Sequence, residues 1–302
     1  MIEQPSSNHS AAPVLSVGLP VYNGEKWIAE AIDSILVQNV EDLELIISDN
    51  ASTDRTESIC RAVAARDSRV RYYRNNTNIG LYRNFDRVFE LATGKYFKWA
   101  ADSDICLEGF FEKCVAVLDA RDDVVLAYPR TLLLLWGPDG EEVVSEYINN
   151  LNIEDDRPSD RFRKYLDRER INNVMHGVIR ASALRKTSLI RPLPGSDISM
   201  IAELSLLGKF IEIPEPLFAR RFDPETSSML MNTSTASTRK VPLGRTFMQR
   251  LDLHAYRFLS TFRAPIDFSE KLKVWLYLLN RATSIRHQVY NKLMRLLMFR
   301  KN

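Results

Sequence analysis

The chain has 302 residues, and its 45% hydrophobic content is enough for the core of one large domain or two modest ones. Because 41 Lys and Arg residues nearly balance 39 Asp and Glu residues, the formal charge of +2 gives no overall field that would favour nucleic acid as a partner. The three cysteines lack the paired spacing of a zinc site or a disulfide framework, which favours a reducing, cytoplasmic compartment.

The first residues of the chain predict a disordered leader. Residues 1–12 are rich in Ser, Asn and Ala, and they lack the basic and then apolar segments of a signal peptide. Apolar runs such as Leu132–Trp136 fall far short of the roughly 20 residues that a membrane-spanning helix needs. We therefore expect no membrane span.

Strand and helix patterns alternate through the first half of the chain. Apolar runs of strand character lie at residues 14–19, 43–47, 70–73 and 96–100. Helical spacing follows each of them, at residues 27–36, 54–63, 84–92 and 107–121. Four successive β-α units with short connections predict an α/β fold with a mostly parallel sheet and helices on both faces.

Polar clusters follow each of the four predicted strands, namely PVYNGE, SDNASTD, NNTNIG and ADSD. In parallel sheets, ligands bind at the carboxyl ends of the strands, so these clusters mark the candidate site. Neither GxGxxG after the first strand nor GxxxxGK[ST] anywhere is present, which disfavours a dinucleotide fold or a P-loop. Some other nucleotide or anion chemistry is indicated.

Asp102 and Asp104 follow the fourth apolar run directly. Carboxylates beside a buried strand are costly unless something pairs with them, and alternate residues of a turn can point to one side. A hard cation with oxygen ligands would be a suitable partner. The alternative is that the two aspartates merely cap a helix that begins near Leu107.

The chain resembles the family 2 glycosyltransferases in five successive segments over about residues 14–222: SVGLPVYNGEKWIAEAIDSIL, LELIISDNASTD, NTNIGLYRNF, ATGKYFKWAADSD and GSDISMIAELSLLGKFIEIPEPLFARR. The resemblance implies a GT-A fold, a nucleotide-sugar donor, Mn²⁺ or Mg²⁺, and inversion at the anomeric carbon. It implies that Asp104 ligates the metal. Asp102 would reach the ribose or act through water, with Ser103 between them near the donor.

The resemblance also assigns residues to the nucleoside. Tyr22, next to Pro20 and Asn23, is our candidate to stack on the base. Asp49 resembles the aspartate that accepts a hydrogen bond from a base ring nitrogen, which would suit a UDP, dTDP or GDP sugar. The alternative for Asp49 and Asn50 is an Asx turn at the end of a strand.

Three arginines are candidates to reach the donor. Arg83 can reach the base or diphosphate, or it can pack on the surface, while Arg220 or Arg221 can hold the diphosphate. Many relatives have a histidine shortly after an arginine in this region, whereas this chain has Phe222 and Asp223. Asp223 can replace it as an oxygen ligand, or water can be the third ligand.

Inverting transfer needs a carboxylate that removes the proton of the acceptor hydroxyl. Asp197, before a predicted helix at residues 198–207, matches the family's general base, with Glu203 in reserve. The alternative for Asp197 is an ordinary N-cap. His176 is interpreted as a core or loop histidine rather than a catalytic one.

The end of the chain differs in character from the rest. Residues 271–302 hold no acidic residue, and apolar side chains recur at helical spacing at Val289, Leu293, Leu296 and Leu297. This predicts a basic amphipathic helix that either rests on an anionic bilayer or packs against the catalytic domain or a second subunit.

The expected organisation is a leader (1–12), a catalytic domain (13–235) and a helical basic extension (236–302). Within the catalytic domain we expect a donor half at about 13–130 and an acceptor half at about 131–235. The predicted function is an inverting glycosyltransferase acting on a glycan or lipid-linked acceptor of surface polysaccharide synthesis. It would be cytoplasmic, either free or on the membrane face. The rivals are a catalytically silent sugar-nucleotide-binding or scaffold protein and a nucleotidyltransferase, for which PVYNGEK is a poor match.

Overall fold

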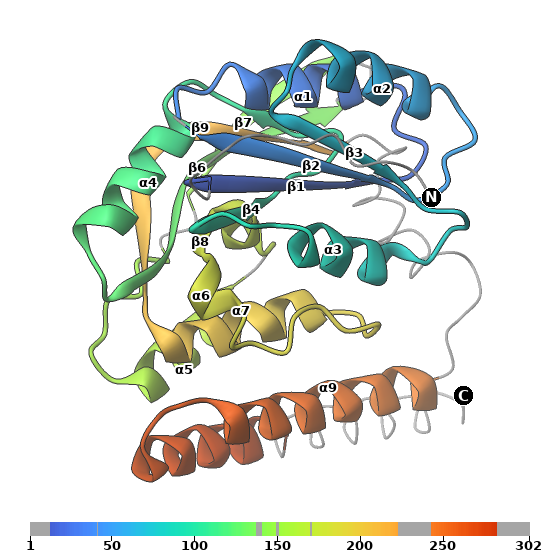
Figure 1. Ribbon diagram of the computed structural model, residues 1–302. Coiled ribbons are helices and arrows are strands. Elements are labelled where there is room, and N and C mark those ends of the chain that lie inside the picture. Colours follow the sequence, from blue (N-terminus) through green and yellow to red (C-terminus); the bar gives the residue numbers. More distant parts are fainter. Residues whose placement is uncertain are drawn as a thin grey trace.

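A computed structural model describes residues 13–40, 42–136, 141–148, 151–169, 171–222 and 243–282. The predicted leader, Asp223 and the apolar positions between residues 289 and 297 lie outside this range. Within it, nine strands form one sheet in the order β3-β2-β1-β4-β8-β6-β9-β5, with β7 beside β6 (Figure 1). The strands are β1 (Leu15–Val21), β2 (Leu43–Asp49), β3 (Val70–Arg74), β4 (Tyr96–Trp99), β5 (Ile105–Cys106), β6 (Val124–Trp136), β7 (Glu142–Tyr147), β8 (Val178–Arg180) and β9 (Lys209–Phe222).

The sheet is mixed but mostly parallel, as predicted. Strands β3, β2, β1 and β4 run parallel, and so do β6 and β9, whereas β8 is antiparallel to both of its neighbours. All residues of β1 and β2 are buried, as is typical of parallel strands covered on both faces. The carboxyl ends of β1, β2, β3 and β4 therefore lie along one edge.

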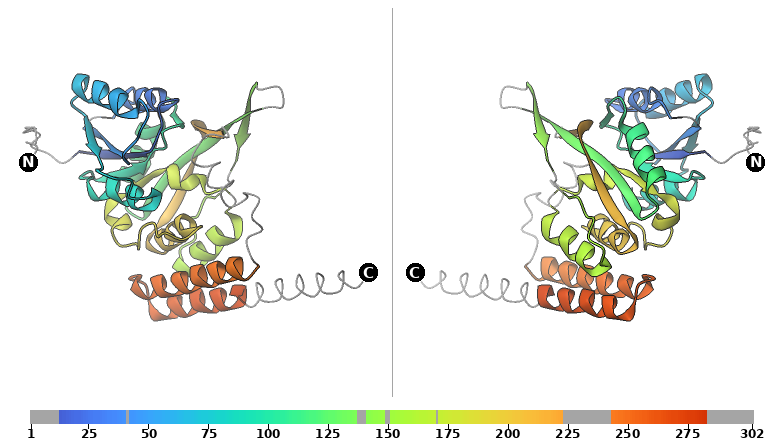
Figure 2. Two further views of the ribbon diagram at one scale, coloured as in Figure 1. Left: turned by 90° about the vertical axis from the view of Figure 1, so that its right-hand side faces the viewer. Right: turned by 90° about the vertical axis from the view of Figure 1, so that its left-hand side faces the viewer.

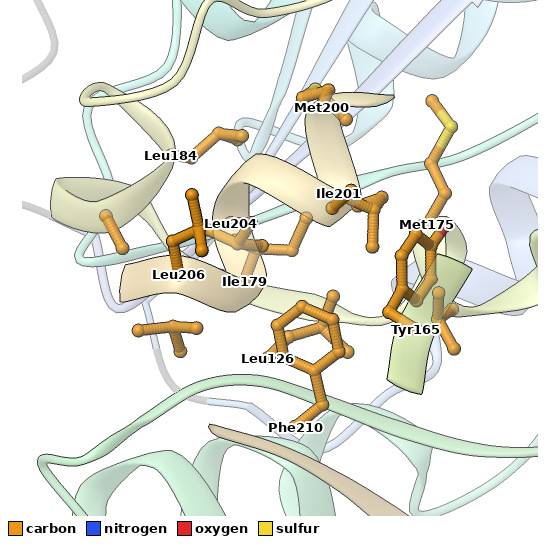
Figure 3. Close-up of a cluster of buried hydrophobic side chains, with 14 of the residues drawn as sticks. Leu126, Tyr165, Met175, Ile179, Leu184, Met200, Ile201, Leu204, Leu206 and Phe210 are labelled. Atoms are coloured by element: carbon orange, nitrogen blue, oxygen red, sulfur yellow. The ribbon is translucent and has the colours of Figure 1, made fainter. Parts of the chain in front are cut away.

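Helices cover both faces of the sheet (Figure 1). Their bounds are α1 (Ile28–Leu36), α2 (Thr56–Arg66), α3 (Leu81–Glu90), α4 (Phe110–Ala120), α5 (Pro158–Arg168), η1 (Asn173–His176), α6 (Ala181–Leu184), α7 (Ser196–Leu207) and α9 (Leu243–Arg263). Buried residues of α1, α2 and α4 form one core cluster, and those of α3, α5 and α7 form another. In the second cluster, Tyr165 of α5 and Ile201 of α7 face Leu126 and Phe210 of the sheet (Figure 3).

The last described helices form a hairpin. After α9, a further helix covers residues 268–282, and the two pack as an outer layer against α5 and α7 (Figures 1 and 2). Val274 and Leu278 of the second helix are buried in the same core cluster as α5 and α7. No helix in the described ranges is long and apolar enough to cross a membrane.

Two local predictions need correction. The helix predicted from Leu107 begins at Phe110, because residues 105 and 106 pair with Ala219 and Phe218 of β9 instead. The first strand, predicted to stop before Pro20, continues to Val21. The proline is tolerated because pairing with β4 has already ended at Gly18, so its missing N–H interrupts no bond on that side.

Candidate active site

The loops after β1 and β2 are joined by hydrogen bonds. The backbone N–H of Asn23 donates to Ser52 Oγ (2.9 Å), and its side-chain oxygen accepts from the N–H of Thr53 (2.9 Å). The N–H of Glu25 donates to Asp54 Oδ2 (3.0 Å). Each loop therefore fixes the other, and the segment carrying Tyr22 has a defined position.

The loop after β3 joins the same network through Asn50. The side-chain oxygen of Asn50 accepts from the N–H of Ile79 (2.9 Å) and from Asn75 Nδ2 (3.1 Å), and its amide donates to Asn78 Oδ1 (2.8 Å). The polar clusters after the first three strands thus meet, as the sequence predicts. The side chain of Asn50 is occupied in holding these loops together.

The acidic pair lies against this group of loops. A Cβ on Gly24 would be 2.5 Å from Asp102 Oδ2, so the carboxylate of Asp102 packs directly on the backbone of the loop after β1. Asp104 is 5% exposed, and its Oδ1 accepts a hydrogen bond from the N–H of Arg221 (3.1 Å). The helix-cap alternative is wrong, because Gly109 precedes α4 and no side chain caps it.

Both acidic side chains are costly to ionise in place. Burial raises the pKa of Asp102 to about 7, and the charge of Asp104 adds to the effect. Burial also raises the pKa of Asp104, against the opposing influence of Arg220, of the Arg221 N–H bond and of Lys98. A divalent cation beside this pair would favour the charged forms.

The residues present fit a hard cation. Asp102 and Asp104 offer the oxygen ligands that Mg²⁺ and Mn²⁺ prefer. Among the described residues, no group of three or more His, Cys, Asp or Glu side chains is arranged for a metal. Whether Asp223 or water is the third ligand stays a prediction, because Asp223 lies outside the described residues.

Arg221 ties β9 to the acidic turn. Its side chain is 5% exposed, its Nη1 donates to Ser103 O (3.1 Å) and its Nη2 lies 3.2 Å from Glu30 Oε2. The guanidinium stacks 3.8 Å from the centre of the Trp27 ring. Arg221, predicted to hold the diphosphate, is thus engaged inside the protein and supports the turn.

Sequence reasoning missed Lys98. It is fully buried in β4, donates to Trp99 O (2.9 Å) and lies 5.1 Å from the centre of the Phe218 ring. A lysine inside the apolar run YFKWAA was a usable signal, because a buried ammonium group needs compensation. The positive charge of Lys98 opposes the rise in the pKa of Asp104.

Asp197 is the second residue of α7. The residue before the helix is Gly195, in the left-handed region (φ 81°), and no side chain caps this end, so the N-cap alternative for Asp197 is wrong. Asp197 Oδ2 instead accepts from Asn172 Nδ2 (2.8 Å), and Asn172 Oδ1 accepts from Tyr165 OH (2.7 Å). Nothing in the local sequence INNV signals that Asn172 orients the carboxylate.

Two neighbouring asparagines, Asn172 and Asn173, contact residues near both Asp197 and Asp104. Asn172 holds Asp197, and the next residue, Asn173, accepts from Arg220 Nη1 (2.7 Å). Arg220 in turn opposes the raised pKa of Asp104. Arg220, held by Asn173, therefore lies near Asp104, while Asn172 holds Asp197.

Two candidates have partners elsewhere. Glu203 is 1% exposed and accepts from the N–H and Oγ of Ser188 (3.0 and 3.4 Å), so its carboxylate serves the loop before α7. Arg83 pairs with Glu90 at the surface (2.7 Å). This contact agrees with the alternative that Arg83 packs on the surface. Neither side chain is directed to the acidic pair.

The nucleoside candidates differ in accessibility. Tyr22 is 48% exposed, so its ring can be covered by a ligand. Asp49 is fully buried, with Oδ1 accepting from the N–H of Ser52 (2.8 Å) and Oδ2 from Tyr72 OH (2.7 Å). The Asx-type contact foreseen as its alternative is therefore present, and a contact with the base stays a prediction.

His176 is a core histidine, as expected. It is 9% exposed and stacks on Phe218 with ring centres 5.4 Å apart. Burial lowers its pKa well below the usual range, and the charges of Arg220 and Lys98 act in the same direction. The ring is therefore neutral at physiological pH.

The sheet with helices on both faces and a buried acidic turn at the carboxyl ends of its strands agrees with the GT-A fold that the resemblance implies. The family model described as "Glycosyl transferase family 2" matches residues 16–190, more than half of the chain, and the chain belongs to this family.

Curated relatives are described as glycosyltransferases. An uncharacterized glycosyltransferase of Haemophilus influenzae is 28% identical over 237 residues, covering 76% of this chain and 71% of that protein. The putative glycosyltransferase EpsE of Bacillus subtilis is 37% identical over 111 residues, covering 36% of this chain and 40% of that protein. The chain thus matches well under half of EpsE.

Solved structures share the fold. S. aureus TarS 1-349 in complex with UDP-GlcNAc superposes with a TM-score of 0.65 at 16% identity, covering 90% of this chain and 73% of that one. The mannosyltransferase PcManGT of Pyrobaculum calidifontis, in complex with GDP-Man and Mn²⁺, has a TM-score of 0.54 at 15% identity and covers 90% and 70%.

Proposed function

We propose that the protein transfers a sugar, with inversion, from a nucleoside-diphosphate sugar to a hydroxyl group of a glycan or lipid-linked acceptor in surface polysaccharide synthesis. The observation that carries the proposal is the pairing of a buried acidic turn, Asp102 and Asp104, with a separately oriented carboxylate, Asp197. The first suits a leaving diphosphate, and the second suits an acceptor.

In this proposal, the residues divide between donor and acceptor. Tyr22 covers the base, and Asp102 and Asp104 hold Mn²⁺ or Mg²⁺ against the diphosphate. When bound, the cation neutralises the charge that grows on the leaving group. The presence of Mn²⁺ together with GDP-Man in the PcManGT complex supports this assignment.

Asp197 takes the acceptor's proton. The acceptor oxygen forms the new bond to the anomeric carbon, the bond from that carbon to the diphosphate oxygen breaks, and the diphosphate leaves with the electron pair. The hydrogen bond from Asn172 holds Asp197 Oδ2 and leaves Oδ1 for the hydroxyl group. Arg220, held by Asn173, adds positive charge near the diphosphate side.

The test is release of nucleoside diphosphate from a panel of UDP, dTDP and GDP sugars with Mn²⁺. Asp104→Asn should abolish release, whereas Asp197→Asn should keep donor affinity and lower turnover by about a hundredfold or more. Asp33→Asn on α1, 62% exposed and paired with Arg66, is the matched control.

Each rival function gives a different result. Pyrophosphate release would indicate a nucleotidyltransferase. Donor binding without release of any nucleoside diphosphate, even with acceptor extracts, would indicate a silent binding protein. If Asp197→Asn loses donor affinity but keeps turnover, the assignment of the base is wrong.

A further inference from the structure

The outer helix of the C-terminal hairpin carries an exposed apolar row. Phe268, Leu272, Leu276 and Leu279 are 70%, 45%, 58% and 57% exposed. Their spacing of four, four and three residues puts them on one side of the helix. A contiguous row of this kind, unlike scattered surface leucines, marks a contact surface.

The opposite side of this helix is firmly attached to the domain. Val274 and Leu278 are buried, and Asp167 of α5 accepts from Tyr277 OH (2.7 Å) and from Arg281 Nη1 (2.8 Å). The hairpin is the outermost layer of the described structure (Figure 2). The apolar row therefore faces away from the catalytic domain.

Helix α9 extends the row at the turn of the hairpin. Leu259 and Phe262 are 65% and 49% exposed. The ring of Phe262 lies 4.3 Å from that of Trp275, and the ring of Phe268 lies 6.0 Å from it, so an aromatic cluster joins the two helices. The hairpin face is defined by six residues: Leu259, Phe262, Phe268, Leu272, Leu276 and Leu279.

Charge is distributed unevenly between this end of the chain and the rest. Residues 243–302 hold 12 of the 41 Lys and Arg residues but 3 of the 39 Asp and Glu residues, a formal charge of +9. Residues 1–242 consequently carry −7. Lys271 lies at the turn of the hairpin, where its Nζ donates to Phe262 O (2.8 Å).

We propose that the hairpin face docks the protein on an anionic lipid bilayer. Apolar side chains would enter the boundary between headgroups and acyl chains, and the excess of basic residues in this end of the chain would favour anionic lipid. A second copy of the chain is the poorer fit, because it would bring together two hairpins that each carry 7 Lys and Arg residues against 3 Asp and Glu residues over residues 243–282. The inference does not depend on the proposed activity.

Vesicle sedimentation of the full chain tests the proposal. The protein should pellet with vesicles of phosphatidylcholine containing about 30% phosphatidylglycerol, pellet much less with phosphatidylcholine alone, and be released by about 0.5 M salt. Leu272→Ser with Leu276→Ser should weaken binding by about tenfold or more, since both side chains lose apolar burial. Val143→Ser with Val144→Ser, also exposed but on β7, is the matched control and should bind normally.

Two results would overturn the proposal. One is equal binding of the wild type and the Leu272/Leu276 variant to anionic vesicles, with circular dichroism showing both folded. The other is a dimer in gel filtration that the variant converts to monomer, without vesicle binding by either protein. Phe268→Ser provides a second variant if the double one does not fold.

Discussion

At the scale of single residues, the site depends on how each carboxylate is held. Asp104 accepts from the backbone of β9, Asp102 rests on the backbone at Gly24, and Asp197 is oriented by an asparagine that is itself held by Tyr165. The three acids therefore have different surroundings, and the roles we propose for them differ accordingly.

Asn172 is expected to be a positioning residue. Asn172→Gly removes the amide while tolerating the left-handed backbone (φ 48°). Turnover should fall by about tenfold with donor affinity unchanged, because Asp197 is no longer aligned. In an Asp197→Asn background the same change should have little further effect. Steady-state rates of the two single variants and the double variant check this, and simple additivity would contradict it.

Asp86 on α3 provides a pH test away from the acidic turn. Burial raises its pKa to about 6, against the hydrogen bond from the N–H of Ile190 (3.3 Å). A raised carboxyl pKa means that stability is lost as pH rises from about 4 to 6. Asp86→Asn should therefore raise the free energy of unfolding more at pH 7.5 than at pH 4. The expected difference between the two effects is ~1–3 kcal/mol. Urea unfolding at both pH values, with Asp33→Asn as control, measures the gain, and a pH-independent difference would refute it.

At the scale of secondary-structure elements, the loops at the carboxyl ends of the strands behave as one unit. The loops after β1, β2 and β3 bond to each other through Asn23 and Asn50, and the acidic turn after β4 packs on them. Strand β9 joins from the other side through Arg221. A change in one loop should consequently alter the positions of Asp102 and Asp104.

Gly24 is the most sensitive point of this unit. A Cβ there would lie 2.5 Å from Asp102 Oδ2 and 2.7 Å from Val21 Cγ2, closer than atoms can approach. Gly24→Ala should cost ~1–3 kcal/mol of stability through overpacking and should weaken donor binding, because the acidic side chain must move. Calorimetric Tm and donor titration measure both effects. The stability loss should shrink in an Asp102→Ala background, and an undiminished loss would show that the clash lies elsewhere.

At the scale of the whole molecule, the hairpin is attached to α5 by ionic contacts as well as by its core residues. Glu270 accepts from the N–H of Ser159 (3.0 Å) and pairs with Lys273. Although burial raises the pKa of Glu270, the bonds from Lys273 and Ser159 outweigh it and hold the pKa at about 2. This anchor fixes which side of the hairpin faces outward.

Because the pKa of Glu270 is depressed, its contribution is present above about pH 4.5 and is lost as pH falls toward 2. Glu270→Gln should therefore loosen the hairpin at neutral pH, and the difference from wild type should diminish in acid. Hydrogen exchange of residues 268–282 at pH 7 and pH 3 measures the loosening. Equal protection of variant and wild type at pH 7 would contradict the anchoring role.

Local sequence was sufficient to predict the alternation of β-strands and helices, the edge of the sheet at which polar clusters gather, and the family. These follow from apolar periodicity and from motifs such as SDNASTD and ADSD, which need no knowledge of distant contacts. Asp102 and Asp104 were selected from the ADSD motif, and Asp197 from the resemblance of its segment to the family. Periodicity also indicated a C-terminal segment of separate character.

The folded chain alone reveals how side chains far apart in the sequence share partners. That Arg221 supports the acidic turn, that Glu203 serves Ser188, and that Asn172 orients Asp197 depend on contacts across 15 to 118 residues. Strand β5 likewise exists because β9 offers it a partner, which no local pattern encodes. Periodicity predicts which side of an element is apolar, but only packing decides which neighbour each polar atom meets.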